Sequence, residues 1–296
     1  MNPEQPILVT GASGVVGWHL CRFLNGQGRA VVGTFRESAP CLEGVCFRQL
    51  RLEDPGSIES LFERQSYRAI VHCAALSHPD ECERQPQQAE TVNVLGTRRL
   101  MEGLVDRRRF VYLSTDQVFD GTKGNYGEVD PTHPVNEYAR GKRIAEAYVL
   151  DRSNSIVVRL SKVFGWGSPF HDCFLDWARS CFESQKQVPL FRDQYRSFVY
   201  VGMVVRALER LIFAHPRHNL YHLGGPGRLS RLDLGELFAQ TFGFDRSLIF
   251  PVSVEGVGQA ARGRDCSLDS SRLTVEFGLQ NRPVREDLQR MKEGLY

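Results

Sequence analysis

A glycine-rich turn near the start of the chain constrains the fold more than any other feature. The turn, Thr10-Gly11-Ala12-Ser13-Gly14-Val15-Val16-Gly17, follows an apolar run at residues 7–9 and opens an amphipathic stretch at residues 15–25. Between a strand and a helix, such glycines make the tight turn, let the backbone approach a pyrophosphate, and let the helix pack on the sheet. A plain tight turn is the alternative. The turn predicts a dinucleotide site whose contacts are Gly11, Ser13, Gly14, Val15, Val16 and Gly17.

The first half of the chain alternates short apolar runs with amphipathic stretches, which is typical of βαβ units that build a parallel sheet. We expect strands at residues 7–9, 30–34, 46–50, 69–72, 110–114 and 156–160. We expect helices at residues 15–25, 57–65, 87–105 and 137–150. The pattern predicts an α/β fold with a doubly wound parallel sheet of the Rossmann type.

This alternation breaks after Gly165. A helical pattern follows at residues 170–184, and the apolar segments at 198–214 and 221–223 suit a return to the first sheet. Ser230, with Asp233 three residues later, resembles a helix cap. We therefore expect two interleaved units. They are a dinucleotide-binding domain (residues 1–164 plus about 198–224) and a smaller C-terminal substrate-binding lobe (about 165–197 and 225–296).

Tyr138 stands four residues before Lys142, within the helix expected at residues 137–150. Residues four apart share one face of a helix. The ammonium can then favour the phenolate of tyrosine, whose ordinary pKa is about 10. A phenol tuned in this way can act as an acid at neutral pH. The spacing therefore predicts Tyr138 and Lys142 as catalytic residues.

Ser114-Thr115-Asp116 ends the apolar run that starts at Phe110. The hydroxyls therefore lie at the carboxyl end of a strand, where the ligands of open α/β sheets bind. We predict that Thr115 is catalytic and hydrogen-bonds a substrate carbonyl. The alternative is a hydroxyl that caps the next turn.

The choice of cofactor rests on the end of the second strand. An acidic residue there binds the ribose 2′-hydroxyl of NAD, but this strand ends in Thr34-Phe35-Arg36. An arginine suits a 2′-phosphate, so we favour NADP, as NADPH, and NAD is the second choice. The alternative is an arginine that lies in solvent, with Glu37 beside it.

Composition excludes several classes of protein. The formal net charge is only +2, from 37 Lys+Arg and 35 Asp+Glu, which argues against nucleic-acid or membrane-surface binding through bulk charge. The eight cysteines form no CxxC pair, and the His and acidic residues at 72–82 lack compact ligand spacing, so we expect no metal. No apolar run is long enough for a membrane span, and residues 1–5 lack a signal peptide's pattern. We therefore expect a cytoplasmic protein.

The motifs together resemble the extended short-chain dehydrogenase/reductase superfamily. They are the glycine turn, Cys73-Ala74-Ala75, Asn93, Thr115 and Tyr138-x-x-x-Lys142. Within the superfamily, residues 114–121 look most like the dTDP-4-dehydrorhamnose reductase branch, and residues 193–197 and 262–269 look like its substrate-lobe segments. The resemblance implies cofactor contacts from Leu52, Cys73, Ala74, Ala75, Asn93, Tyr138 and Lys142, besides the turn and Arg36.

The resemblance further implies an NADPH-dependent reductase of a 4-keto sugar attached to a nucleoside diphosphate. Arg196 and Arg264 are the candidates for the diphosphate, because guanidinium groups match phosphate oxygens. A structural ion pair is the alternative for either arginine. Asp116, Phe164 and Trp166 are the other expected substrate contacts, with the two aromatic side chains closing one side of the cleft against water.

Two other functions stay open. The same branch resembles the regulatory β subunit of methionine adenosyltransferase, and a fold does not fix a function. An epimerase or dehydratase on this scaffold is the third reading, although Asp116 is followed by Gln117 and not by a glutamate. The branch commonly has an acidic or amide residue near position 51, where this chain has Arg51. A homodimer is compatible with the sequence but not required by it.

Overall fold

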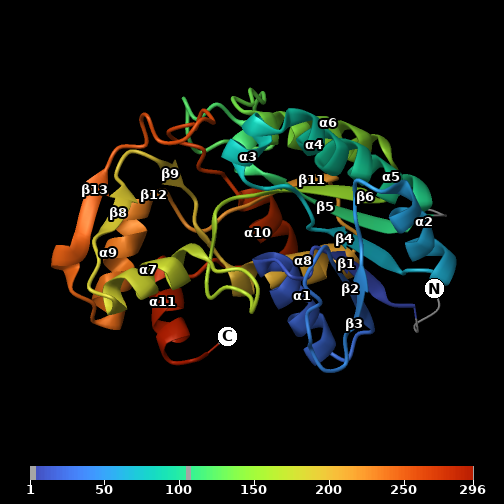
Figure 1. The fold of residues 1–296 in the computed structure, drawn as a ribbon, viewed down its shortest axis with the longest axis horizontal. Coiled ribbons are helices and arrows are strands. Elements are labelled where there is room, and N and C mark those ends of the chain that lie inside the picture. The colour runs from blue at the N-terminus through green and yellow to red at the C-terminus, as the bar shows by residue number, and fades with distance from the viewer. Residues whose placement is uncertain (1–4, 105–107, 296) are drawn as a thin grey trace.

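The computed structural model describes residues 5–104 and 108–295 (Figure 1). Its centre is a seven-stranded sheet of order β11-β6-β5-β4-β1-β2-β3, in which every neighbouring pair is parallel. The strand order reverses between β1 and β4, which is the switch point of a doubly wound sheet. The predicted fold class is therefore confirmed. The strands are β1 (Ile7–Thr10), β2 (Val31–Phe35), β3 (Cys46–Gln49), β4 (Ala69–His72), β5 (Arg109–Thr115), β6 (Ser155–Leu160) and β11 (Leu220–Leu223).

Helices cover both faces of the sheet, so its strands are apolar on both sides. Within β1, for example, Ile7 and Val9 join the core on one face and Leu8 joins the core on the other. The first face is covered by α1 (Val15–Gly26), α8 (Val201–Phe213) and α10 (Ser271–Phe277). The second is covered by α2 (Pro55–Arg64), α4 (Pro86–Glu90), α5 (Gly96–Gly103) and α6 (Glu137–Asp151).

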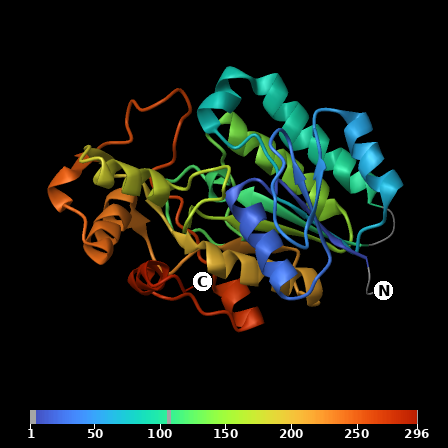
Figure 2. The ribbon, with the colours of Figure 1, turned by 60° about the horizontal axis from the view of Figure 1, so that its bottom comes forward.

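A second lobe is built by two excursions of the chain from the sheet (Figure 2). The first, between β6 and α8, contains β7 (Val163–Phe164), α7 (Phe174–Glu183), β8 (Val188–Phe191), β9 (Tyr195–Arg196) and β10 (Val199–Tyr200). The second, between β11 and α10, contains β12 (Leu229–Ser230), α9 (Arg231–Phe242), a 3-10 turn (Arg246–Leu248) and β13 (Ile249–Val252). The final helix, α11 (Val284–Lys292), packs into the apolar core of this second lobe.

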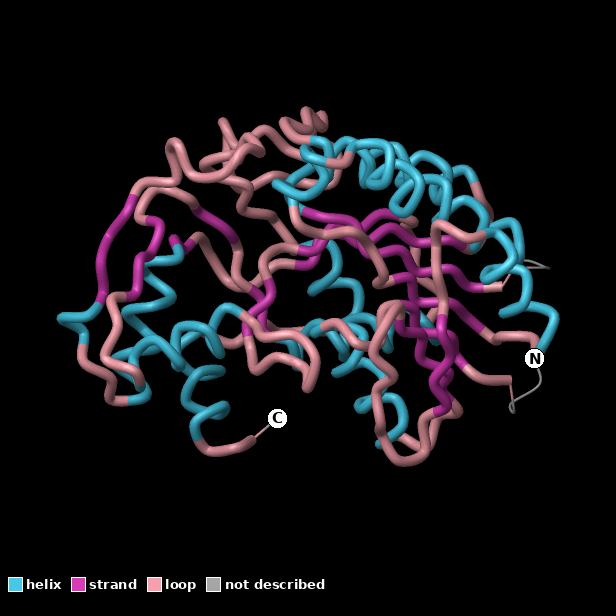
Figure 3. Tube along the Cα trace, viewed as in Figure 1, coloured by secondary structure: helices cyan, strands magenta, loops and turns pink. Residues whose placement is uncertain are grey.

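Strand pairing joins the two excursions to each other (Figure 3). β13 runs parallel to β8, and β12 pairs antiparallel with β9. The expected cap of α9 is present, because Ser230 Oγ accepts from the Asp233 amide at 3.0 Å and Asp233 Oδ2 accepts from the Ser230 amide at 2.7 Å. The two lobes are therefore interleaved in sequence, as predicted.

The structure differs from the expected elements within residues 79–174 in three places, and α10, α11 and the short strands of the second lobe were not predicted at all. The single helix expected at residues 87–105 is divided into α4, a π-helical turn (Thr91–Leu95) and α5, and Val105 lies outside the described residues. A short helix, α3 (Pro79–Arg84), was not predicted. Helix α7 begins at Phe174 rather than 170, because the Cys173 amide donates to Asp176 Oδ2 at 2.8 Å and starts the helix there.

The start of α1 lies unusually close to the turn before it. A Cβ atom at Gly17 would lie 2.3 Å from the Gly11 carbonyl oxygen and 2.8 Å from its carbon. These are backbone atoms, so they cannot rotate away as a side chain can. Gly26, at the other end of α1, has no atom within 4 Å of the corresponding position.

We expect Gly17→Ala to lower the free energy of unfolding by at least about 1–3 kcal/mol, the usual cost of overpacking a filled interior. Gly26→Ala is the matched control, and we expect it to be neutral or slightly stabilising because alanine favours helices. Urea unfolding followed by circular dichroism measures both. Equal stabilities for the two variants would contradict the close packing at Gly17.

Candidate active site

The glycine turn lies at the switch point, where β1 and β4 end side by side. Gly11 has a φ of +66°, and a Cβ there would lie 2.8 Å from Ala74 Cα. Thr10 Oγ1 accepts from the amides of Cys73 and Ala74, each at 3.2 Å, which ties the two strand ends together. Gly14 is the N-cap of α1 and supplies no side-chain cap. The first amides of α1 therefore remain available to an anion.

Buried polar residues hold the backbone next to this turn. Both ring nitrogens of His72 are hydrogen-bonded. Nδ1 lies 2.7 Å from Thr10 Oγ1, and Nε2 lies 3.0 Å from Thr97 Oγ1. Burial lowers the pKa of His72 to about 3, so the ring is neutral. Asn93 uses both ends of its amide on Leu76, receiving from the Leu76 amide at 2.8 Å and donating to its carbonyl at 3.0 Å. Asn93 therefore holds the segment that follows Ala75.

Leu52 and Arg36 are two further residues that were expected to contact the cofactor. Leu52 is buried and packs against Gly96, where a Cβ would lie 2.8 Å from Leu52 Cβ. Arg36 follows β2 and is half exposed. The Ala12 amide donates to Thr34 O at 2.7 Å, which brings the glycine turn beside the end of β2. The structure therefore brings Arg36 to the same edge as the turn.

The three expected catalytic residues come from β5 and α6. Thr115 is the last residue of β5, and its Oγ1 accepts from the Gln117 amide at 3.2 Å. Tyr138 lies in the first turn of α6, which begins because Asn136 Oδ1 accepts from the Ala139 amide at 2.9 Å. Lys142 lies one turn later, with Nζ 4.1 Å from the centre of the Tyr112 ring. All three side chains are buried.

The pKa values of Tyr138 and Lys142 differ from those expected from their spacing. Burial raises the pKa of Tyr138, Asp116 raises it further, and the Thr115 hydroxyl lowers it. Burial also lowers the pKa of Lys142 to about 7, against the raising effects of Glu146 and Cys73. Lys142 is thus only partly charged near neutral pH, so the expected lowering of the tyrosine pKa is not seen in this structure. Tyr138 keeps its proton.

Glu146 fixes the helix that carries this pair. It accepts from Ser114 Oγ at 2.6 Å and receives both Nε and Nη2 of Arg159, at 3.0 and 2.9 Å. Both members of this ion pair are buried. Because Ser114 precedes Thr115 in β5, one carboxylate joins the helix of Tyr138 to the strand of Thr115.

A pocket of about 630 Å³ opens beside Asp116, between the two lobes. Thr115 and Tyr138 do not line this pocket, but Asp116 accepts a hydrogen bond from Thr115 Oγ1 at 3.3 Å, and its charge acts on Tyr138. Arg196 Nε lies 3.3 Å from Asp116 Oδ2, and Arg262 Nη2 lies 2.6 Å from Asp80 Oδ2. The pocket is lined by Ser77, His78, Pro79, Asp80, Glu81, Arg84, Asp116, Gln117, Lys162, Gln194, Arg196, Phe198, Arg231 and Arg262.

Three cations of this pocket, Arg84, Lys162 and Arg231, form no ion pair with a carboxylate among the described residues, and Glu81 is the one lining carboxylate without such a pair. Lys162 follows β6 and is exposed to the open pocket. Arg231 begins α9, with its guanidinium 5.4 Å from the rings of both Phe174 and Phe191. Burial and the nearby Arg196 and Arg262 lower the pKa of Arg231 to about 10, so it stays charged at neutral pH. The pocket therefore has uncompensated positive charge.

The structure places three expected substrate residues elsewhere. Phe164 is buried against Tyr200, with ring centres 5.7 Å apart, and Trp166 packs on Phe238 and Phe242 at 6.3 and 5.7 Å. Both belong to the apolar core of the second lobe and not to the pocket wall. Arg264 is 65% exposed and pairs with Glu255, so its charge is already compensated outside the pocket.

Arg84, Lys162 and Arg231 are the pocket cations that the sequence did not single out, whereas Arg262 belongs to the segment 262–269 that resembles the substrate lobe. Lys162 had a usable signal, because it comes just after an apolar strand, at the edge where ligands bind. Arg84 and Arg231 had none, since only the folding of the chain brings them into one pocket.

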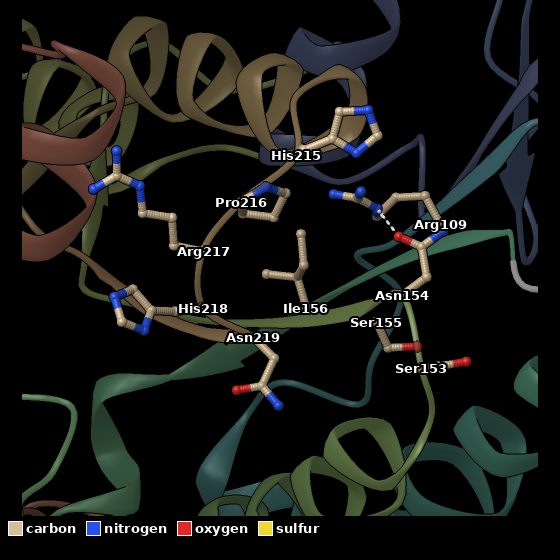
Figure 4. A pocket seen from close by; sticks show the side chains of 10 residues that line it. All are labelled: Arg109, Ser153, Asn154, Ser155, Ile156, His215, Pro216, Arg217, His218 and Asn219. Carbon is tan, nitrogen blue, oxygen red and sulfur yellow. Dashed lines mark hydrogen bonds between the residues drawn. The ribbon is translucent and has the colours of Figure 1, made fainter.

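A second pocket, of about 680 Å³, lies at the opposite edge of the sheet (Figure 4). Arg109 forms part of its wall and donates to Asn154 Oδ1 at 2.7 Å and to Leu211 O at 2.7 Å. None of the expected catalytic or cofactor residues lines this pocket. It therefore does not belong to the candidate active site.

Two further observations concern metal binding and membrane spans among the described residues. They contain no group of three or more His, Cys, Asp or Glu side chains that could hold a metal ion. Among them there is no helix with the length and apolar character needed to cross a membrane.

A doubly wound sheet, a glycine turn at its switch point and a tyrosine–lysine helix beside it place the chain in the extended short-chain dehydrogenase/reductase superfamily. Its branch follows from a family model described as the RmlD substrate binding domain, which matches residues 5–296. The chain belongs to this family, the dTDP-4-dehydrorhamnose reductase-like branch of the superfamily.

Individual relatives differ in what they are named for. The chain is 32% identical over 286 residues to the probable low-salt glycan biosynthesis reductase Agl14 of Haloferax volcanii, covering 95% of each chain. It is 27% identical over 297 residues to methionine adenosyltransferase 2 subunit beta of Xenopus laevis, covering 96% of this chain and 86% of that protein. The solved dTDP-4-dehydrorhamnose reductase of Bacillus anthracis with NADP has a TM-score of 0.85 at 22% identity, covering 98% and 99%. That last likeness concerns the fold.

The buried Lys142 generates a prediction about pH. Its pKa is about 7 in the folded chain, against an ordinary value of 10.5. Between pH 7 and pH 10.5 the unfolded chain binds more protons at Lys142 than the folded chain does. Lys142 therefore makes the free energy of unfolding rise with pH in this range.

We expect Lys142→Met to be more stable than the unaltered protein below pH 7, and the difference to shrink by at least about 1 kcal/mol toward pH 10, since one pKa unit corresponds to about 1.4 kcal/mol. Denaturant unfolding at several pH values measures it, with the exposed Lys186→Met as control. A difference that does not change with pH would contradict the burial of a titrating ammonium.

Proposed function

We propose that this protein is an NADPH-dependent reductase of a keto sugar attached to a nucleoside diphosphate. The observation that carries the proposal is a pocket with an excess of positive charge whose wall includes Asp116, the residue that accepts from Thr115 Oγ1 and whose charge acts on Tyr138. The names of Agl14 and of the Bacillus anthracis enzyme support it. The first lobe, residues 1–164 plus about 198–224, would bind the cofactor. The second, about 165–197 and 225–296, would bind the substrate.

The residues around the glycine turn fit a dinucleotide. Gly11 and Gly17 allow a turn so tight that a Cβ at either position would meet backbone atoms within 3 Å, and the uncapped amides of α1 after Gly14 suit a pyrophosphate. Ser13, Val15 and Val16 would contribute backbone groups there, and Cys73, Ala74 and Ala75 the facing wall. When bound, the nicotinamide supplies the hydride that reduces the ketone.

The chain's own residues would then supply the proton and the orientation. Tyr138 keeps its phenolic proton because burial raises its pKa, so it can donate that proton to the oxygen of the reduced carbonyl. Thr115, whose hydroxyl acts on Tyr138, would orient the same oxygen. Lys142, partly charged near pH 7, would hold the nicotinamide ribose and favour loss of the tyrosine proton once substrate is present.

The charge of the pocket supports a diphosphate. Asp116 pairs with Arg196 and Asp80 pairs with Arg262, which leaves the cations of Arg84, Lys162 and Arg231 against the single carboxylate of Glu81 among the described lining residues. A diphosphate linking a nucleoside to a sugar carries about two negative charges, which would compensate this excess of positive charge. Arg196 would contribute one N–H of Nη2, since its other donors face Asp116, the Tyr195 carbonyl and the Gly263 carbonyl.

A regulatory subunit is the second candidate, and the similarity to methionine adenosyltransferase 2 subunit beta favours it. Such a protein could keep the dinucleotide site without turnover. The open pocket beside Asp116 supports the reductase. An epimerase or dehydratase has less support, because Gln117 follows Asp116 where an acid–base pair would be needed.

Tyr138→Phe deletes only the proposed proton donor. We expect it to retain NADPH binding and to lose about 10²–10⁴-fold in turnover, the usual contribution of general acid catalysis. Measurement uses NADPH absorbance with dTDP-4-keto-6-deoxy sugars, alongside a binding titration. An unchanged rate would assign the proton to another group.

Arg231→Ala and Lys162→Ala test the anion site. We expect each to weaken dTDP binding by about 1.5–3 kcal/mol, the range for hydrogen bonds to charged groups. Arg264→Ala, which removes an exposed arginine outside the pocket, is the control and should bind dTDP as the unaltered protein does. Calorimetry measures all three. If only Arg264→Ala weakened dTDP binding, Arg264 would be a diphosphate ligand, as expected from the sequence, and Arg231 and Lys162 would not.

A further inference from the structure

Two arginines, not one, stand at the edge of the sheet where an adenosine ribose would lie. Arg36 follows β2 and Arg51 follows β3. These strands run parallel with Phe35 opposite Gln49, and the Leu50 amide donates to Phe35 O at 2.9 Å, so the two strand ends lie side by side. The two guanidinium groups therefore reach the same edge from adjacent strands.

Glu53 lies between these arginines. Its Oε1 is 3.7 Å from Arg36 Nε and 3.8 Å from Arg51 Nη1. Both distances exceed the roughly 3.2 Å limit of ordinary N–H···O hydrogen bonds, so the carboxylate is held by charge and not by directed bonds. Glu37 lies 3.9 Å from Arg36 Nε and is 75% exposed, so it adds a weaker charge.

The backbones of the two arginines are fixed, while their side chains face solvent. Gln49 Nε2 donates to Arg36 O at 2.9 Å, and the Arg51 amide donates to Ser57 Oγ at 3.0 Å. The side chains of Arg36, Arg51 and Glu53 are 46%, 45% and 29% exposed. An incoming anion can therefore reach both guanidinium groups by displacing one loosely held carboxylate.

We propose that Arg51 is a second ligand of the 2′-phosphate of NADPH beside Arg36, and that Glu53 competes with this phosphate and thereby sets the preference for NADPH over NADH. This inference rests on the proposed function, whose cofactor it concerns. A phosphate monoester carries up to two charges and three acceptor oxygens, which suits two guanidinium groups better than a single carboxylate does. NADH has no such group, so the Arg36–Glu53–Arg51 arrangement would stay as it is.

The role of Glu53 separates this arrangement from a simple basic patch. Removing a competing carboxylate strengthens the binding of an anion, whereas removing a carboxylate that receives a ribose hydroxyl weakens the binding of NADH. The two roles therefore give opposite results in one variant.

The test is a calorimetric titration of the unaltered protein, Arg51→Gln and Glu53→Gln with NADPH and with NADH, without substrate. For Arg51→Gln we expect NADPH binding to weaken about tenfold, since a charge-assisted hydrogen bond contributes about 1.5 kcal/mol or more. For Glu53→Gln we expect NADPH binding to tighten about two- to fivefold, in line with an exposed ion pair. NADH binding should change less than twofold in both variants.

Arg246→Gln and Glu236→Gln are matched controls, because Arg246 Nη2 and Glu236 Oε2 form an exposed pair 3.8 Å apart in the second lobe. Neither should alter the binding of either nucleotide. Unchanged NADPH binding in Arg51→Gln would overturn the second ligand, and weaker NADH binding in Glu53→Gln would overturn the competition. If the unaltered protein bound neither nucleotide, the proposed cofactor itself would be wrong. If it bound NADPH but reduced no keto-sugar nucleotide, only the reductase would fail.

Discussion

The buried ion pair between Glu146 and Arg159 is the interaction on which the candidate active site depends. Glu146 receives two nitrogens of Arg159 from β6 and the hydroxyl of Ser114 from β5, so α6 is held on the sheet at a fixed position. Tyr138 and Lys142 precede Glu146 by two turns and one turn of the same helix. Removing one partner of a buried pair typically costs about 3–5 kcal/mol, because the other charge remains uncompensated. The geometry of the proposed catalytic residues is therefore linked to the stability of the domain.

A second set of ion pairs links the two lobes across the pocket. Arg196 comes from the second lobe and Asp116 from the end of β5, and Arg262 comes from the second lobe and Asp80 from α3. Arg84, Lys162 and Arg231 line the same pocket and form no ion pair with a carboxylate among the described residues. Beyond the carboxyl ends of β2 and β3, Arg36 and Arg51 each lie within ion-pair distance of Glu53. The candidate cofactor and substrate regions thus each place arginines beside carboxylates at the carboxyl ends of the strands.

Local patterns in the sequence predicted much of this structure, and contacts distant in sequence were not predictable. The glycine turn, the strand at residues 69–72 and the Tyr138–Lys142 spacing follow from a few neighbouring residues, and the fold class followed with them. The partners of Arg196 and Arg262 lie 80 and 182 residues away, so no local pattern could identify them. Phe164 and Trp166 show another limit: an aromatic residue after a strand suits a cleft wall as well as a core, and here the second lobe's core contains both. The pKa values of Tyr138 and Lys142 likewise depend on burial, which spacing alone does not reveal.

The most direct test of the reductase is to follow the hydride itself. NADPH carrying deuterium at the transferable position of the nicotinamide is mixed with the protein and dTDP-4-keto-6-deoxy sugars, and the sugar product is analysed by mass spectrometry. Our account predicts a product with one deuterium on the former carbonyl carbon, formed at a rate that depends on protein concentration. An unlabelled sugar that remains a ketone, from a protein that still binds NADPH, would contradict the reductase and favour the regulatory function.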